Sequence, residues 1–192
     1  MKRLILASAS PRRRELLRQA GFTFEVVAPE VDETYPGGED PAAFAERLAL
    51  AKAAQIAQRF TAKDDVVVLG ADTVVVADRE LLGKPASADD ARAMLRKLSG
   101  IAHRVITGVA LAAPGATRRA VGHEVTRVFF RPLTEEEITA YVATGEPLDK
   151  AGAYAAQGRA ARFVTRVEGC YFNVVGLPVA LVDRLLRDWN RD

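Results

Sequence analysis

The sequence of 192 residues contains 49% hydrophobic and 27% charged residues, which is enough apolar material for a folded core and excludes a disordered chain. Its formal net charge is +2 and its basic residues are scattered apart from one cluster at residues 12–14, which disfavours a duplex nucleic-acid-binding protein. The single cysteine, Cys170, excludes an internal disulfide and fits a reducing compartment, and no apolar run reaches the roughly 20 residues that span a bilayer.

Strand and helix patterns alternate along the chain, and this alternation predicts an α/β protein with a mixed sheet. Short apolar or β-branched runs predict strands at residues 4–7, 22–27, 66–76, 105–112, 121–130 and 169–175, with a bend near residues 70–72. Helical periodicity and end signals predict helices at residues 11–20, 40–60, 87–100, 134–145 and 178–189. Capping-box spacing supports two of these helix starts, with Ser87 before Asp90 and Thr134 before Glu137.

One segment departs from this alternation. Residues 144–162 are rich in glycine and alanine and have no periodicity, which predicts a functional loop or a mobile flap. The chain contains no repeat, no low-complexity tract and no long linker, so residues 1–192 are predicted to form a single domain.

The start of the first predicted helix has an unusual charge. Ser10 is a good N-cap and Pro11 suits the first helical position, but Arg12, Arg13 and Arg14 follow where the helix dipole favours acidic residues. The conflict is resolved if an anion binds there, because free backbone N–H groups and guanidinium forks together hold phosphate. A solvated basic turn is the alternative, and it accounts equally well for Arg14.

A lysine interrupts the apolar face of the second predicted helix. Phe44, Leu48, Lys52 and Ile56 follow one another at i+4 spacing and therefore share one face. The ammonium of Lys52 either extends to solvent at the edge of the core or reaches a phosphate in a cleft. The sequence alone leaves both interpretations open.

An aspartate lies within the most apolar strand of the chain. Asp72 follows Gly70-Ala71 in a β-branched run, where a buried carboxylate is costly unless it is paired, hydrogen-bonded or bound to a metal. Gly70 permits either a bulge or a close backbone approach. Asp72 is therefore a structural acid or a candidate for holding Mg²⁺ and orienting a water molecule. Glu33 could add a second carboxylate. Lys84 lies on a tight turn between Gly83 and Pro85, and such turns are usually surface features without a function.

Seven short motifs occur in a fixed order along nearly the whole chain. They are Ser8-Ala9-Ser10-Pro11-Arg12-Arg13, Val31-Asp32-Glu33, Lys52, Gly70-Ala71-Asp72-Thr73, Gly83-Lys84-Pro85, Asp149-Lys150-Ala151-Gly152-Ala153-Tyr154 and Asn173-Val174-Val175-Gly176-Leu177-Pro178. Together they resemble the Maf family of nucleoside triphosphate pyrophosphatases. The resemblance implies an elongated two-lobed α/β fold around a mixed sheet with a central cleft, similar to the inosine triphosphate pyrophosphatases. It also implies a cytoplasmic location and a homodimer. Binding of nucleic acid through residues 12–14 is disfavoured instead by the mild net charge and by the absence of stacking aromatic residues near this cluster. No membrane partner is expected, because no apolar run is long enough to span a bilayer.

The resemblance also implies roles for individual residues. Asp72 is expected to be the catalytic proton acceptor and, with Glu33, a ligand of a divalent cation, with Mg²⁺ expected and Mn²⁺ or Co²⁺ as alternatives. Ser8, Arg13, Lys52 and Lys84 are expected to contact the phosphates and the metal site.

Three further positions resemble those of the branch that hydrolyses dTTP and UTP to the monophosphate and diphosphate, namely Arg12, Thr73 and Gln157. A glutamine amide offers one donor and one acceptor, which match the O4 and N3–H edge of uracil or thymine. Ala155-Ala156 departs from the commoner glycine and branched residue before Gln157 and could alter the pocket's fit. The alternatives are the branch that prefers 7-methylguanosine triphosphate and a non-catalytic nucleotide-binding regulator of septum formation.

Overall fold

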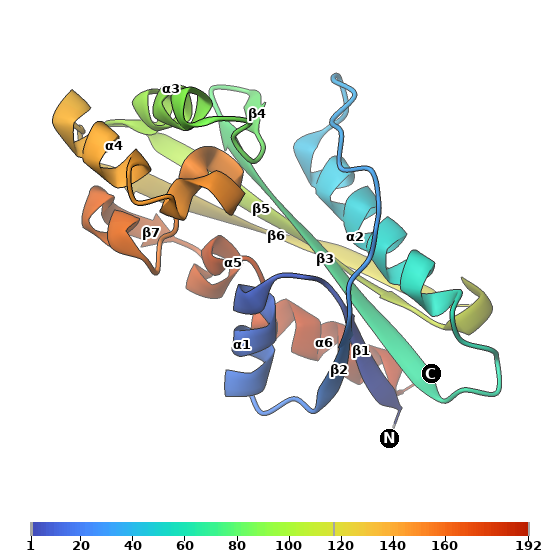
Figure 1. The fold of residues 1–192 in the computed structure, drawn as a ribbon. Helices are drawn as coiled ribbons and strands as arrows, with labels where there is room; N and C mark the ends of the chain where they lie inside the picture. The colour runs from blue at the N-terminus through green and yellow to red at the C-terminus, as the bar shows by residue number, and fades with distance from the viewer. Residues whose placement is uncertain (1, 117, 192) are drawn as a thin grey trace. The chain divides into compact units, whose positions relative to one another are not determined.

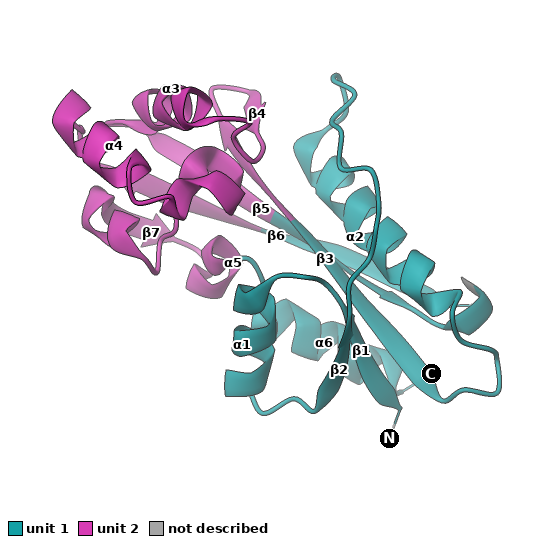
Figure 2. Ribbon diagram, viewed as in Figure 1, with its two compact units in different colours: residues 1–72, 107–124, 176–192 teal, residues 73–106, 125–175 magenta. Residues whose placement is uncertain are grey.

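The computed structural model describes residues 2–116 and 118–191, and the chain divides into two compact units. Unit 1 comprises Met1–Asp72, Thr107–Glu124 and Gly176–Asp192, and unit 2 comprises Thr73–Ile106 and Val125–Val175 (Figure 2). The chain therefore leaves unit 1 directly after Asp72, passes through it again at Thr107–Glu124, and returns to it finally at Gly176.

The strands form a seven-stranded sheet of order β2-β1-β3-β5-β6-β7, in which β4 pairs with β3 (Figure 1). Strand β1 runs parallel to both β2 and β3, whereas β3–β4 and β6–β7 are antiparallel pairs. The sheet is therefore mixed, as the sequence predicts. The strands are β1 Arg3–Ala7, β2 Phe24–Val27, β3 Val66–Ala77, β4 Glu80–Leu82, β5 Ala102–Ala112, β6 Arg119–Phe130 and β7 Val164–Glu168.

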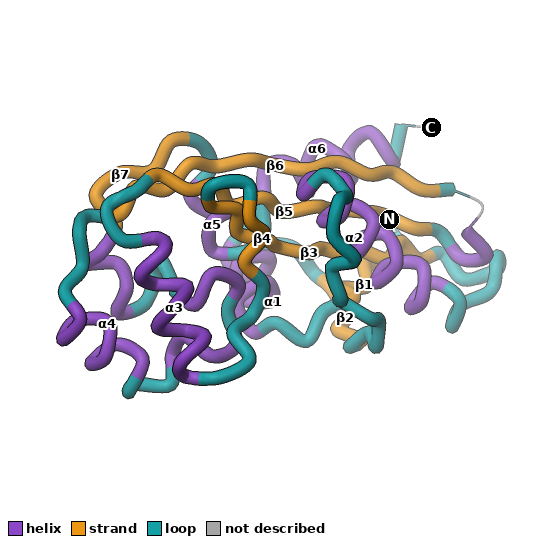
Figure 3. Tube along the Cα trace, turned by 90° about the horizontal axis from the view of Figure 1, so that it is seen from above, coloured by secondary structure: helices purple, strands orange, loops and turns teal. Residues whose placement is uncertain are grey.

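Of the α-helices formed by residues 2–116 and 118–191, three belong to each unit. They are α1 Pro11–Gln19, α2 Pro41–Ala57 and α6 Val179–Trp189 in unit 1, and α3 Ala88–Leu98, α4 Glu135–Val142 and α5 Tyr171–Val175 in unit 2. Within unit 2, α3 and α4 pack against each other on one side of the strands (Figure 3). In the part of the chain that the structure describes, no helix is long and apolar enough to cross a membrane.

The predicted helix ends are confirmed where they depend on local hydrogen bonds. The Ser10 hydroxyl accepts a bond from the Arg13 N–H at the start of α1, and Thr134 and Glu137 form the full capping box of α4. Gly21 has a φ of +80° just after α1, and the three N–H groups that follow the helix bond back to its last turn. At α3 the Ser87 hydroxyl accepts from Asp90, but the Asp90 carboxylate accepts from Ala86 N–H, so this box is incomplete.

The predicted strand at residues 169–175 is wrong. The strand is β7, which ends at Glu168, and residues Tyr171–Val175 form the short helix α5. The β-branched pair Val174-Val175 favours a strand by propensity, but tertiary contacts decide otherwise. The fully buried Asn173 donates to the Val105 carbonyl at 3.0 Å and to the Thr126 hydroxyl at 2.9 Å, and these two bonds fix the helical turn.

Two further predictions need correction. Strand β3 is continuous from Val66 to Ala77, without the bend expected near residues 70–72. Residues 144–162 are not an open loop, because the 3₁₀ helices η2 (Glu146–Asp149), η3 (Ala151–Ala153) and η4 (Arg159–Phe163) follow one another there. The remaining 3₁₀ helix is η1, Pro114–Ala116. Tyr154, Ala155 and Ala156 are consecutive and all buried in unit 2. Buried residues therefore do not recur at helical spacing here, which is why the sequence of this segment shows no periodicity.

Candidate active site

The acidic centre of unit 1 consists of Asp72, Glu33 and Lys52. The Lys52 Nζ lies 2.6 Å from Asp72 Oδ1 and 2.6 Å from Glu33 Oε1, so one ammonium bridges two carboxylates. Lys52 and Asp72 are 5% and 7% exposed, whereas the Glu33 side chain is 42% exposed. Lys52 is therefore not a lysine that extends to solvent at the edge of the core. Its contact with a phosphate stays a prediction.

Two glycines bring the helix that carries Lys52 close to the sheet. A Cβ on Gly70 of β3 would lie 2.1 Å from the Ala49 carbonyl oxygen of α2, and a Cβ on Gly108 of β5 would lie 2.3 Å from the Ala45 carbonyl oxygen. Only glycine allows backbone to approach backbone at this distance. Gly70 lies two residues before Asp72, so this close approach also brings Lys52 to the carboxylate.

A second cluster lies at the start of α1. Arg13 Nε donates to the Gly176 carbonyl at 2.9 Å, and Arg13 Nη1 donates to the Ser8 hydroxyl at 3.4 Å. The Ser10 N–H also donates to the Ser8 hydroxyl, at 3.1 Å. Burial lowers the pKa of Arg13, and the charge of Asp72 opposes that shift, so the guanidinium lies within electrostatic reach of the acidic centre. Ser8 and Arg13 are thus held in place by several bonds.

The remaining predicted site residues are distributed between the two units. Arg12 is half-buried on α1 in unit 1, and Thr73 is the first residue of unit 2, directly after Asp72 on β3. Lys84 and Gln157 are exposed on turns of unit 2. The carbonyl of Gly83 accepts a bond from the N–H of Gly152 at 3.0 Å, which ties the lysine turn to η3.

Two residues beside Gln157, Tyr141 and Glu146, are not predicted from the sequence as part of the site. Tyr141 Oη lies 2.8 Å from Glu146 Oε1, and these two side chains bond to the backbone on both sides of Gln157. The only sequence signal is a tyrosine five residues before a glutamate across Gly145, which is too short a pattern to predict a function.

Comparison with known proteins decides the family. A family model described as a Maf-like protein matches residues 3–189. The chain belongs to the Maf family. This Maf protein is 54% identical over 187 residues to the dTTP/UTP pyrophosphatase of Pelotomaculum thermopropionicum, covering 97% of this chain and 96% of the relative. It is also 54% identical over 179 residues to the dTTP/UTP pyrophosphatase of Symbiobacterium thermophilum, covering 93% and 90% of the two chains.

A solved structure confirms the fold class. The Maf protein aligns with the Staphylococcus aureus Ham1 protein with a TM-score of 0.52, covering 97% of this chain and 99% of that chain at 13% identity. At this identity the likeness shows the fold alone. The α/β fold predicted from the order of elements is therefore confirmed.

Proposed function

We propose that this Maf protein hydrolyses dTTP and UTP to the nucleoside monophosphate and diphosphate. The observation that carries the proposal is the convergence of two carboxylates, Asp72 and Glu33, on the buried Lys52, with Arg13 in electrostatic reach. This combination of carboxylates and cationic side chains suits a polyphosphate substrate. The cations offset the negative charge of the phosphates, and a carboxylate can accept the proton of the attacking water molecule. Both relatives are named dTTP/UTP pyrophosphatase, which supports the same substrates.

The acidic centre fits a divalent cation. Among residues 2–116 and 118–191 no group of three or more His, Cys, Asp or Glu side chains could hold a metal ion. Mg²⁺, however, is commonly held by one or two carboxylates together with substrate phosphates. Asp72 and Glu33 already converge on one positive charge, the Lys52 ammonium, and they are the residues that would hold Mg²⁺, Mn²⁺ or Co²⁺. When bound, such a cation would neutralise charge on the phosphate oxygens.

The protein side chains supply the rest of the reaction. Asp72 accepts the proton of the water molecule that attacks the α-phosphorus, and the bond from that phosphorus to the bridging oxygen breaks as diphosphate leaves. Lys52 and Arg13 stabilise the negative charge on the phosphates. Because Ser8 and the Gly176 carbonyl already hold the Arg13 guanidinium, little conformational entropy remains to be lost when a phosphate binds.

The roles proposed for the other residues rest on membership of the Maf family and suit their chemistry. Arg12 and Lys84 offer further cations to the polyphosphate, Thr73 offers a hydroxyl, and the exposed Gln157 offers an amide to the O4 and N3–H edge of the base. Cytosine presents the inverse pattern of donor and acceptor and should be rejected.

A panel of triphosphates tests the activity. The protein is incubated with dTTP, UTP, dCTP and 7-methylguanosine triphosphate in Mg²⁺, Mn²⁺ or Co²⁺, and diphosphate and monophosphate are measured separately. We expect the highest kcat/KM with dTTP and UTP, and we expect Asp72→Asn to be the inactive control. Preferred hydrolysis of 7-methylguanosine triphosphate would overturn the substrate assignment, and the absence of diphosphate with every substrate would overturn the catalytic one.

The base assignment is tested with Gln157→Glu. A carboxylate facing the O4 acceptor in a partly desolvated site costs on the order of 1–3 kcal/mol, about 5- to 150-fold in kcat/KM. The same carboxylate suits the N1–H and amino group of guanine, so the ratio of dTTP to dGTP hydrolysis should fall. An equal decrease for all bases would mean that Gln157 does not read the base.

A further inference from the structure

The turn that carries Gln157 is held at both ends by one pair of side chains. Two residues before Gln157, the Ala155 N–H donates to the Tyr141 hydroxyl at 3.1 Å. Two residues after it, the Arg159 N–H donates to Glu146 Oε1 at 3.0 Å. The Tyr141 hydroxyl donates to Glu146 Oε1 at 2.8 Å, so both ends of the turn connect through a single hydrogen-bonded pair. We call Tyr141 and Glu146 the clamp.

A glycine in the turn leaves space for the Glu146 carboxylate of the clamp. A Cβ on Gly158 would lie 2.5 Å from Glu146 Oε1, so only glycine lets the carboxylate reach the Arg159 N–H. The Gly158 N–H also donates to the Ala155 carbonyl at 3.0 Å, which closes the turn around Gln157. Ala155 and Ala156 are buried, whereas Gln157 is exposed. The turn is therefore fixed at its base and offers one polar side chain.

The clamp itself is anchored to α4. Tyr141 is 1% exposed, and its ring packs edge-on against Phe163 with centroids 5.3 Å apart. The Thr144 hydroxyl donates to the Tyr141 carbonyl at 2.6 Å and accepts from the Glu146 N–H at 3.2 Å, which ties the glutamate back to the helix end. Burial and the Glu146 carboxylate raise the pKa of the Tyr141 hydroxyl, so it stays protonated and remains a donor.

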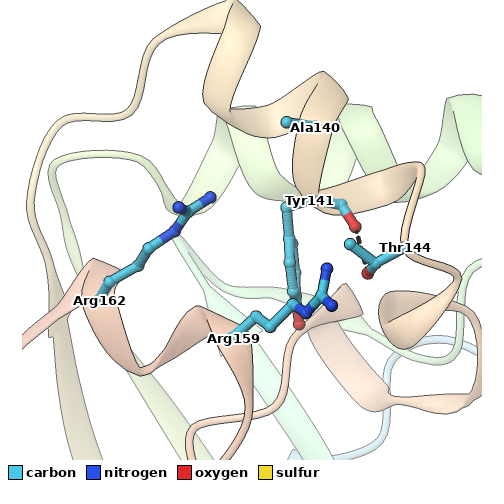
Figure 4. A pocket seen from close by; sticks show the side chains of 5 residues that line it. All are labelled: Ala140, Tyr141, Thr144, Arg159 and Arg162. Atoms are coloured by element: carbon cyan, nitrogen blue, oxygen red, sulfur yellow. Dashed lines mark hydrogen bonds between the residues drawn. The ribbon is translucent and has the colours of Figure 1, made fainter.

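A pocket with a volume of about 470 Å³ lies beside Tyr141 of the clamp (Figure 4). Ala140, Tyr141 and Thr144 line this pocket from α4 and the residues that follow it, and Arg159 and Arg162 line it from η4. The hydrogen bond between Thr144 and Tyr141 is drawn as a dashed line. The pocket therefore lies directly beside Tyr141 and Arg159, which are both hydrogen-bonded within the clamp arrangement.

We propose that Tyr141 and Glu146 are positioning residues that fix the turn of Gln157 and thereby set the discrimination between bases. The inference rests on the proposed function, because it assigns to the clamp the orientation of the side chain that is proposed to read the pyrimidine edge. Discrimination by hydrogen bonds requires a donor and an acceptor held in one orientation, since a mobile amide can rotate to suit the wrong base.

The test measures kcat/KM for dTTP and dCTP in the wild type, Tyr141→Phe, Gln157→Ala and the double variant. Tyr141→Phe keeps the ring against Phe163 but removes the hydroxyl and both of its hydrogen bonds. It should lower the dTTP:dCTP ratio by about 3- to 10-fold, the effect of weakening one hydrogen bond between Gln157 and the base. In the Gln157→Ala background the same change should leave the ratio unaltered, because the clamp acts through Gln157.

Tyr154→Phe is the matched control. Tyr154 directly precedes Ala155, and its buried hydroxyl lies 2.8 Å from His103 Nε2. The substitution therefore removes a second buried hydroxyl but no hydrogen bond of Tyr141 or Glu146. Its ratio should stay within about 2-fold of the wild type. An equal change in Tyr154→Phe and Tyr141→Phe would overturn the proposal, because general loosening would then explain both. Thermal unfolding of each variant checks that the proteins are folded.

A second pair of variants keeps the test decisive if Tyr141→Phe does not fold. Glu146→Ala removes the acceptor of both bonds and should lower the ratio, and Glu146→Gln retains one oxygen and should restore most of it. An unchanged ratio in Glu146→Ala or Tyr141→Phe, with a lowered ratio in Gln157→Ala, overturns the clamp alone. An unchanged ratio in Gln157→Ala overturns the base-reading role in the proposed function, and the role of the clamp with it.

Discussion

Substitution of Gly70 by alanine should damage the acidic centre from a position that carries no functional group. The new Cβ would lie 2.1 Å from the Ala49 carbonyl oxygen and 2.8 Å from the Ala53 nitrogen, and both are backbone atoms that cannot rotate away. Helix α2 would have to retreat by roughly 1.5 Å to reach ordinary contact distance. Overpacking of this kind costs about 1–3 kcal/mol, which for a chain of this size lowers Tm by about 2–10 °C.

The same retreat should also lower activity. Lys52 lies on α2 and contacts Asp72 at 2.6 Å, so a shift of the helix moves the ammonium relative to the proposed base. Displacements of about 1 Å in a catalytic arrangement can cost up to about 100-fold in rate. We therefore expect kcat for dTTP to fall by roughly 10-fold or more in Gly70→Ala, measured by diphosphate release at a temperature well below its Tm.

Gly122→Ala is the control for this experiment. Gly122 also lies on a strand of unit 1, but its Cβ would meet only Leu181 Cδ1 at 3.5 Å, which is ordinary contact. This variant should be as stable as the wild type or slightly more stable, by about 0.4–1 kcal/mol, because alanine restricts the unfolded chain. If Gly70→Ala matched Gly122→Ala in both Tm and kcat, the close approach of α2 to β3 would not be what positions Lys52.

Three further predictions concern single side chains. Asp72→Asn should lower kcat for dTTP by about 100-fold or more, and a variant that kept more than about a tenth of normal diphosphate release would exclude Asp72 as the proton acceptor. Arg13→Ala should raise KM for dTTP and also cost about 1 kcal/mol of stability, because it loses its bonds to the Gly176 carbonyl and the Ser8 hydroxyl; a stability loss with an unchanged KM would mean a structural role alone. Burial lowers the pKa of His103 from 6.5 to about 4. Between these two pH values the unfolded state binds one more proton than the folded state. The free energy of unfolding should therefore fall as the pH drops from 6.5 to about 4, by at most about 3 kcal/mol. Urea unfolding of wild type and His103→Gln across this pH range tests the last prediction, and equal slopes for the two proteins would contradict it.

Much of the fold could be predicted from the sequence because local interactions decide it. The capping box of Thr134 and Glu137 and the glycine after α1 act within one helical turn, and both predictions are confirmed. The alternation of apolar strands with helices gave the mixed α/β class for the same reason. A strand prediction failed where propensity and tertiary contacts disagree, because the bonds of Asn173 to Val105 and Thr126 are invisible in the local sequence.

For the candidate site, too, local sequence determined one part and tertiary packing the other. The sequence by itself determined that Asp72, Lys52 and the arginines of α1 are costly where they stand, since charge in an apolar run or against a helix dipole needs a partner. Only the tertiary structure decided that Lys52 bridges Asp72 and Glu33, and that Tyr141 and Glu146 hold the turn of Gln157. The physical reason is that a desolvation cost is a property of one residue and its neighbours in sequence. The partner that offsets it lies 20 residues away for Lys52 and Asp72, and only the packing of helix on strand brings the two together.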